Sequence, residues 1–181
     1  MAVYISMLRG INVGGNAKIS MADLKALYES LGFTQVQTHI QSGNVVMAYD
    51  GEPARLVNMI EKALQRRFGF DVKVVVRTVK GLETSIRNNP FPGREGALHM
   101  TFLSEKPVRT ADNDINRVKS PGEEICVKGT EVYILCPDGY GRTKLSNNFL
   151  ERKLGVVATT RNWKTVHALL AMAKSVAPAQ D

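Results

Sequence analysis

In the first 78 residues, short runs of hydrophobic residues typical of strands alternate with stretches that have the hydrophobic spacing of helices. Four short runs rich in Val and Ile are typical of strands and cover residues 3–8, 36–40, 44–49 and 72–77. Two intervening stretches carry apolar residues three or four positions apart, which predicts helices with one buried face. Their stripes consist of Leu24, Leu27, Tyr28 and Leu31, and of Leu56, Val57, Ile60, Ala63, Leu64 and Phe68. The predicted order βαββαβ is that of a ferredoxin-like unit.

Ser20 followed by Asp23 is typical of a helix N-terminus, and Gly32 is typical of a helix end.

The two faces of the first predicted sheet differ in what they contact. A ferredoxin-like sheet carries helices on one face only, so we expect the second face to be polar or covered. Alternation along the strands assigns to that face Tyr4, Ser6, His39, Val46, Ala48, Lys73, Val75 and Arg77. Its apolar members predict a partial cover, by the second half of the chain or by another chain.

The second half of the chain repeats the same order less regularly. Strands are predicted at residues 97–103, 125–128, 131–135 and 156–158, and helices at 112–119, after Ser146 and again from Trp163 onward. We therefore predict an α+β fold of two ferredoxin-like units, with antiparallel sheets and helices packed on one face, plus a C-terminal helix. The predicted division is 1–78 for the first unit, 79–95 for a connecting helix and linker, and 96–181 for the second unit with the C-terminal helix.

Charge is distributed unevenly along the 181 residues, whose formal net charge is +7. Residues 139–175 carry Glu151 as their one acidic residue and seven basic residues, Arg142, Lys144, Arg152, Lys153, Arg161, Lys164 and Lys174. A positive surface attracts anionic partners such as nucleic acid, nucleotides or phosphorylated metabolites. Solubility alone is the alternative explanation.

The sequence also indicates a compartment. The first residues are typical of a strand rather than of a targeting segment, and no apolar run reaches the length of a membrane span. Cys126 and Cys136 lie in a predicted hairpin turning at Gly129 and Thr130, which places the two thiols on opposite sides of the ribbon. We expect reduced thiols, a cytoplasmic protein and no membrane partner.

The most unusual segment is residues 9–18, directly after the first strand. Gly10 and Gly15 have the glycine spacing of a P-loop, but Asn16 and Ala17 stand where the Lys and the Ser or Thr of a P-loop belong. The segment is therefore not a P-loop. Two interpretations remain open: a loop with glycines at turn positions, or an anion site built from backbone amides and the following helix N-terminus.

The predicted topology brings this segment beside a second polar loop, because the first and third strands are antiparallel neighbours. Arg9 and Lys18 would supply charge, the amides of Gly14 and Gly15 an anion nest, and Asn12, Gln41 and Asn44 orientation, with Ser42 in the same loop. Arg161 and Asn162 would join them if the last helix packs back across that end.

Residues 159–163 form a third candidate segment. Thr159 and Thr160 are predicted to cap the last helix, which places Arg161 in its first turn, where the helix dipole disfavours a cation. That placement suggests either a grip on a carboxylate or phosphate or a pairing with an acidic neighbour. The three histidines His39, His99 and His167 are isolated in the sequence. No catalytic residue, metal site or cofactor is predicted, since zinc spacings, the dinucleotide fingerprint and the nucleophile elbow are missing from the sequence.

Three segments carry a resemblance to a known family. Residues 8–15 (LRGINVGG), 41–45 (QSGNV) and 159–163 (TTRNW) resemble the signature segments of the bacterial family called domain of unknown function 1697, in the same order. The resemblance implies a ferredoxin-like α/β fold and a bacterial cytoplasmic protein. It implies no established activity, cofactor or catalytic residue.

Three functions remain as hypotheses. The first is binding of an anionic small molecule, a nucleotide or a phosphorylated metabolite, at the two loops of the first unit. The second is non-specific nucleic-acid binding through residues 142–174, and the third is a protein-interaction module that uses the partly apolar sheet face. We do not expect a conventional RNA-recognition module, because Asn44 and Val46 stand where stacking aromatics belong. The sequence leaves open both an enzymatic activity and the oligomeric state.

Overall fold

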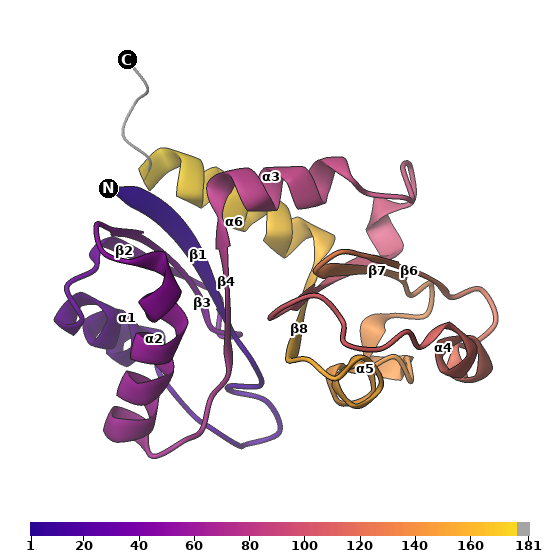
Figure 1. Ribbon diagram of the computed structural model, residues 1–181, viewed down its shortest axis with the longest axis horizontal. Coiled ribbons are helices and arrows are strands. Elements are labelled where there is room, and N and C mark those ends of the chain that lie inside the picture. The colour runs from indigo at the N-terminus through magenta and orange to yellow at the C-terminus, as the bar shows by residue number, and fades with distance from the viewer. Residues whose placement is uncertain (177–181) are drawn as a thin grey trace. The chain divides into compact units, whose positions relative to one another are not determined.

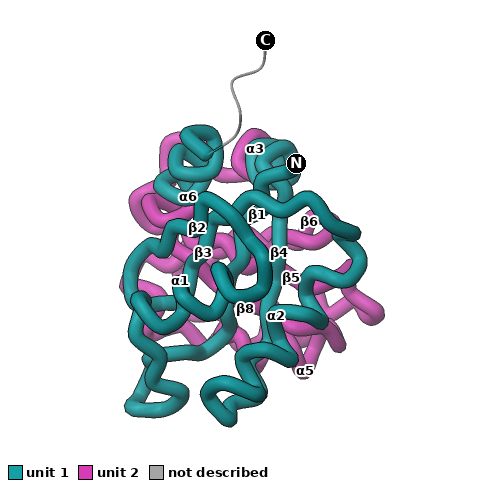
Figure 2. Tube along the Cα trace, turned by 90° about the vertical axis from the view of Figure 1, so that its left-hand side faces the viewer, with its two compact units in different colours: residues 1–84, 167–181 teal, residues 85–166 magenta. Residues whose placement is uncertain are grey.

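The computed structural model describes residues 1–176, and the chain divides into two compact units. One unit contains residues 1–84 together with the C-terminal segment from His167, and the other contains residues 85–166, as the colours of Figure 2 show. The segment from His167, which the prediction assigns to the second unit, groups with the first unit. A salt bridge of 2.6 Å between Lys174 Nζ and Glu83 Oε1 joins this segment to the helix containing Glu83.

The first unit has the predicted ferredoxin-like topology. Its elements are β1 (Ala2–Leu8), α1 (Met21–Ser30), β2 (Thr34–His39), β3 (Asn44–Tyr49), α2 (Pro53–Phe68), β4 (Val74–Thr78) and α3 (Val79–Arg87), the last of which runs past the unit boundary. The four strands form an antiparallel sheet in the order β2-β3-β1-β4. Ser20 caps α1 as predicted: its Oγ accepts from the Asp23 N–H at 3.0 Å and donates to Asp23 Oδ2 at 2.6 Å.

The core of the first unit lies between one face of this sheet and helices α1 and α2 (Figure 1). Leu24 and Tyr28 from α1, and Ile60 and Leu64 from α2, are almost completely buried there. A hydroxyl pair crosses this interface, because Ser6 Oγ and Tyr28 Oη lie 2.8 Å apart with both residues fully buried.

The prediction that Tyr4 and Ser6 lie on the face without helices is wrong. Both face the helices, since Tyr4 belongs to the core cluster and Ser6 contacts Tyr28. The register pairs Ile5 with Val46, so the second face carries the odd-numbered residues of β1. Strand β1 is apolar on both faces, and its pattern therefore does not distinguish them. The apolar residues of the second face are all buried: Val3, Ile5, Met7, Val46, Ala48 and Val75.

The second unit repeats the topology, which confirms the predicted fold class. Its elements are β5 (Leu98–Leu103), α4 (Asp112–Val118), β6 (Glu124–Lys128), β7 (Glu131–Leu135), α5 (Asn147–Leu154) and β8 (Ala158–Asn162), with short 3-10 helices at Glu95–Ala97 and Tyr140–Arg142. The sheet order is β6-β7-β5-β8, again antiparallel throughout. Its core includes Leu103, Val132, Ile134, Phe149 and Leu150. Ser146 caps α5 as predicted, since its Oγ accepts from the Phe149 N–H.

The predicted end of this unit is wrong by several residues. Strand β8 does not cover residues 156–158 but begins at Ala158 and ends at Asn162. Thr159, Thr160 and Arg161 are therefore strand residues, and α6 (Trp163–Val176) begins after them. The cap of α6 is Asn162, whose Oδ1 accepts from the Thr165 N–H at 2.8 Å. Threonine suits a strand as well as a cap, and here Thr160 pairs with Thr101 of β5 through a hydroxyl contact of 2.7 Å.

Cys126 lies opposite the residue that the hairpin prediction assigns to it. The register of β6 and β7 pairs Cys126 with Tyr133, and the thiols of Cys126 and Cys136 are both free. Burial raises the pKa of Cys136 to about 11. Among the described residues, no helix combines the length and the apolar character that crossing a membrane requires.

Candidate functional site

Residues 9–18 and residues 40–43 lie side by side at one end of the first sheet. Strands β1 and β3 pair antiparallel up to Met7 and Asn44, and the Leu8 N–H donates to the Gly43 carbonyl at 2.8 Å. The predicted topology required these two loops to be neighbours, and this strand pairing makes them so. The two loops therefore form a single surface in the first unit.

Asn12 holds the two loops together. Its Nδ2 donates to the Gln41 carbonyl at 2.8 Å and to the Ile19 carbonyl at 2.9 Å, and its Oδ1 accepts from the Ile19 N–H at 2.9 Å. The residue has a φ of 56°, in the left-handed region that Asn tolerates better than most side chains. Both donors of its amide group are thus used within the protein. Asn12 shapes the site instead of presenting a donor to a ligand.

The two central glycines of the segment form a tight turn. The Asn16 N–H donates to the Val13 carbonyl at 3.1 Å across Gly14 and Gly15, whose φ values are 59° and 81°. Positive φ at both central residues is typical of a type I′ turn, which explains why glycine occupies both positions. The turn interpretation left open by the sequence thus accounts for these glycines. The Gly15 N–H takes no part in the turn's hydrogen bond.

A cavity of about 440 Å³, here named the loop pocket, opens between the two loops and the start of α1. Its lining residues are Asn12, Gly15, Lys18, Ile19, Ser20 and Gln41. Lys18 is the one ionisable residue among them, and it forms no ion pair with any residue in the described part of the chain. The Ser20 hydroxyl is occupied by Asp23, as described above.

Four of the ten predicted site residues line the loop pocket: Asn12, Gly15, Lys18 and Gln41. Four others from the same loops do not: Arg9, Gly14, Ser42 and Asn44. Asn44 is fully buried and closes the hairpin, because its Nδ2 donates to the His39 carbonyl at 3.0 Å and to Ser42 Oγ at 2.9 Å. The hairpin therefore explains the burial and the hydrogen bonds of Asn44.

The remaining two predicted residues, Arg161 and Asn162, belong to the other unit. Arg161 is 7% exposed, and its guanidinium donates to Thr159 Oγ1 at 2.9 Å and to the Thr160 carbonyl at 2.8 Å. Burial lowers its pKa to about 10, so the side chain stays charged at neutral pH. The prediction that Arg161 opposes the dipole of a helix is wrong, because the residue lies in β8.

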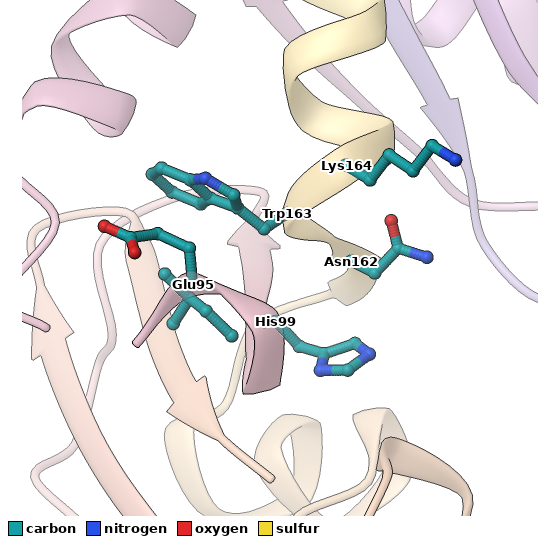
Figure 3. A pocket seen from close by; sticks show the side chains of 7 residues that line it. Glu95, His99, Asn162, Trp163 and Lys164 are labelled. Atoms are coloured by element: carbon teal, nitrogen blue, oxygen red, sulfur yellow. The ribbon is translucent and has the colours of Figure 1, made fainter. Parts of the chain in front are cut away.

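A second cavity, of about 450 Å³, lies in the second unit and is here named the Trp163 pocket (Figure 3). It is lined by Glu95, Gly96, Leu98, His99, Asn162, Trp163 and Lys164. Of these residues, only Asn162 was predicted from the sequence as a site residue. His99 pairs with Asn162 across β5 and β8, and this pairing would have added His99 to the predicted site residues. It was not recognised because the predicted last strand ended too early.

His99 has an unusual environment for an isolated histidine. Its ring stacks on Tyr140 with centroids 5.0 Å apart and an interplanar angle of 23°. Its Nδ1 is buried and has no hydrogen-bond partner among residues 1–176. Burial lowers the pKa of the imidazole. The ring is therefore neutral at physiological pH.

The basic segment of residues 142–174 is less exposed and less unbalanced than the sequence indicates. Arg161 is buried, Lys153 lies 3.0 Å from Asp114, and Lys174 is paired with Glu83. These contacts remove or neutralise part of the charge on which the nucleic-acid hypothesis depends.

Comparison with known proteins places the chain beside uncharacterised relatives. The family model described as "Protein of unknown function (DUF1697)" matches residues 1–133. A solved structure of a conserved bacterial protein, SP0830 from Streptococcus pneumoniae, is similar with a TM-score of 0.74 and 23% sequence identity, over 95% of this chain and 98% of that chain. At this identity the similarity concerns the fold. The search of curated proteins found no match.

Proposed function

Because the chain belongs to the DUF1697 family, which is described as proteins of unknown function, we propose a function from its own residues: the first unit binds an anionic small molecule in the loop pocket. The ligand class is a nucleotide or a phosphorylated metabolite. The observation that carries the proposal is the lining of the pocket, in which Lys18 is the one ionisable side chain and stands among neutral polar groups.

The groups left for a ligand are those that the loops do not use themselves. The Asn12 amide and the Ser20 hydroxyl already have partners within the protein. Three donors remain: the Lys18 ammonium, the Gln41 side-chain amide, which has no partner within residues 1–176, and the Gly15 N–H. An ammonium with two amide donors suits phosphate oxygens, because hydrogen bonds between charged groups are the stronger ones.

Asp23 is the acidic group beside this site. Its carboxylate accepts from Ser20, which lines the pocket. A carboxylate near a bound anion weakens binding by like-charge repulsion. The Asp23 carboxylate favours ligands of modest charge over polyanions. Removal of its charge is expected to change affinity in the opposite direction to removal of the charge of Lys18.

The two other hypotheses receive less support from the structure. The nucleic-acid hypothesis depends on exposed positive charge. Arg161 is buried, and Lys153 and Lys174 are in ion pairs, so part of that charge is not available. The interaction module requires a sheet face open to a partner, whereas Val46 and Val75 are at most 1% exposed.

The proposal is tested by thermal-shift titrations with inorganic phosphate, pyrophosphate and AMP at low and moderate salt. A ligand at 100 times its Kd stabilises the folded state by about 2.7 kcal/mol, which raises Tm by several degrees. Loss of one charge-assisted hydrogen bond costs about 1.5–3 kcal/mol, so Lys18→Gln is expected to weaken binding by at least tenfold. Asp23→Asn is expected to tighten it.

The matched control is Lys62→Gln, which removes the same charge from an exposed position on α2. An equal loss of affinity in the Lys18 and Lys62 variants would mean that binding follows net charge rather than the pocket. Absence of a saturable shift with all three anions would reject the proposal.

A further inference from the structure

A further cavity, of about 320 Å³, lies in the second unit beside the segment that joins β5 to α4, and is here named the Arg109 pocket. This segment is the counterpart of the one that joins β1 to α1 in the first unit and forms most of the loop pocket. The loop after the first strand thus borders a cavity in each unit. The lining residues are Pro107, Val108, Arg109, Thr110, Ala111, Asp112, Val127 and Leu154.

The pocket is built against the end of helix α5. The Val108 N–H donates to the Leu154 carbonyl at 3.1 Å, so the segment before α4 passes beside that helix, as the view in Figure 1 shows. A Cβ at Gly155 would overlap Val108 Cγ2 and would lie 3.4 Å from Arg109 Nη2. The guanidinium of Arg109 therefore lies close to the C-terminal end of α5, where the helix dipole favours a cation.

The accessible apolar surface of the pocket comes from Pro107, Val108 and Val127. Val108 is 65% exposed, more than any other large apolar side chain of residues 1–176. Pro107 and Val127 are half-buried. Transfer of such surface from water into contact with an apolar group is favourable. The pocket therefore suits a ligand that carries an apolar group.

Two opposite charges line the pocket without neutralising each other. Arg109 and Asp112 are both exposed, and the side chain of neither forms an ion pair or a hydrogen bond within residues 1–176. The neighbouring acid Asp114 differs in this respect, because Lys153 Nζ lies 3.0 Å from its Oδ2. The same small cavity therefore offers one positive and one negative group to a ligand.

The chemistry of the lining identifies a class of ligand. A guanidinium binds a carboxylate through paired hydrogen bonds, and a carboxylate accepts hydrogen bonds from an ammonium group. A volume of about 320 Å³ is near the lower end of the range for small-molecule pockets. We propose that the Arg109 pocket binds a free α-amino acid with an apolar side chain, such as leucine. Its carboxylate contacts Arg109, its ammonium group contacts Asp112, and its side chain covers Val108.

The experiment titrates the full chain by calorimetry with leucine and with two analogues that each lack one charged group. Of these, 4-methylpentanoate lacks the ammonium group and 3-methylbutylamine lacks the carboxylate. Saturable binding of leucine is expected, and each analogue is expected to bind at least about tenfold more weakly because it loses one charge-assisted interaction. Absence of saturable leucine binding, or an analogue that binds as tightly as leucine, would overturn the proposal.

Two substitutions assign the charged contacts. Arg109→Gln is expected to weaken leucine binding about tenfold and to leave the binding of 3-methylbutylamine, which has no carboxylate, unchanged. Asp112→Asn is expected to weaken leucine binding to a similar degree but to leave 4-methylpentanoate binding unchanged or tighter, because it removes a like charge. Both side chains are exposed, so both variants are expected to remain folded. A loss that is the same for all three ligands would contradict these contacts.

The matched controls are Lys106→Gln and Glu105→Gln, which remove the same charges from exposed residues of the same segment that do not line the pocket. Both are expected to leave leucine binding unchanged, and losses equal to those of the Arg109 and Asp112 variants would overturn the proposal. Lys18→Gln is likewise expected to have no effect, because Lys18 lies in the other unit. Since titration of the loop pocket with anions uses Lys18 as its readout, failure of one proposal does not entail failure of the other.

Discussion

The side-chain amide of Asn12 donates to the carbonyl of Gln41 at 2.8 Å, which joins two loops separated by 29 positions in the chain. The same amide donates to Ile19, so one residue sets the spacing of three backbone segments. The loop pocket lies among these segments. Its shape therefore depends on a residue whose hydrogen-bonding groups face the protein.

Replacement of Asn12 by Asp tests this role. Asp tolerates the positive φ and keeps the acceptor for the Ile19 N–H, but it cannot donate to the two carbonyls. The expected loss of unfolding free energy is about 1–3 kcal/mol, the cost of leaving buried or partly buried polar groups unsatisfied. Urea denaturation measures it. Asn16→Asp, at an exposed turn position, is the control and is expected to change stability by less than about 0.5 kcal/mol.

A close approach at Gly43 gives a second prediction. A Cβ at this position would lie 2.6 Å from Ile11 Cδ1 and 2.9 Å from Leu8 Cβ, and both of those side chains are buried. With the positive φ of 76° added, Gly43→Ala is expected to cost about 2–4 kcal/mol, the sum of overpacking and left-handed strain.

Gly14→Ala is the matched control for this substitution. Gly14 also has a positive φ, of 59°, but no atom lies within 4 Å of its Cβ position. Strain alone predicts a cost of about 1–2 kcal/mol there. Equal losses of denaturation midpoint in the two variants would show that contact with Ile11 and Leu8 is unimportant.

Sequence patterns were sufficient to predict the topology and part of the lining of the loop pocket. Capping and turn signals at Ser20 and Ser146 correspond to real helix starts, and the strand order follows from the βαββαβ pattern. Lys18 and Gln41 could be predicted to lie close together because the topology alone brings their loops together.

The errors arose where a pattern has two physical solutions. Thr159 and Thr160 fit a helix cap and a strand equally well, and the pairing of β8 with β5 decided for the strand. In β1, apolar residues on both faces hide which side Ser6 occupies, and the buried hydroxyl of Tyr28 settles it. The environment of His99 depends on a cross-strand neighbour and on Tyr140, 41 positions away in the chain, neither of which a local pattern contains.

The buried hydroxyl pair of Ser6 and Tyr28 yields a third prediction. Removal of one partner leaves the other without a hydrogen bond in the core, so Ser6→Ala and Tyr28→Phe are each expected to cost about 1–3 kcal/mol. The double variant leaves no orphan and is expected to cost less than the sum of the single losses. A double-mutant cycle by urea denaturation measures the coupling, for which about 0.5–3 kcal/mol is typical of residues in contact. Additive losses would contradict the hydrogen bond.

The last prediction concerns pH and follows from the environment of His99. Burial lowers the pKa of this imidazole in the folded protein below its usual value of 6.5. The unfolded chain therefore binds the proton at a higher pH than the folded chain does. Because stability rises with pH wherever the unfolded state holds more protons, His99 destabilises the fold as the pH falls below about 6.5. The penalty stops growing below the folded pKa.

His99→Phe removes this contribution and no other titrating group. Denaturation midpoints of the parent protein and the variant at pH 7.5 and at pH 5 are therefore expected to diverge on the acid side, with the variant losing less stability. Glu95 and Lys164 line the same pocket but are common to both proteins, so their titration cancels in the difference. Parallel losses between the two pH values would mean that the imidazole is not held neutral by burial.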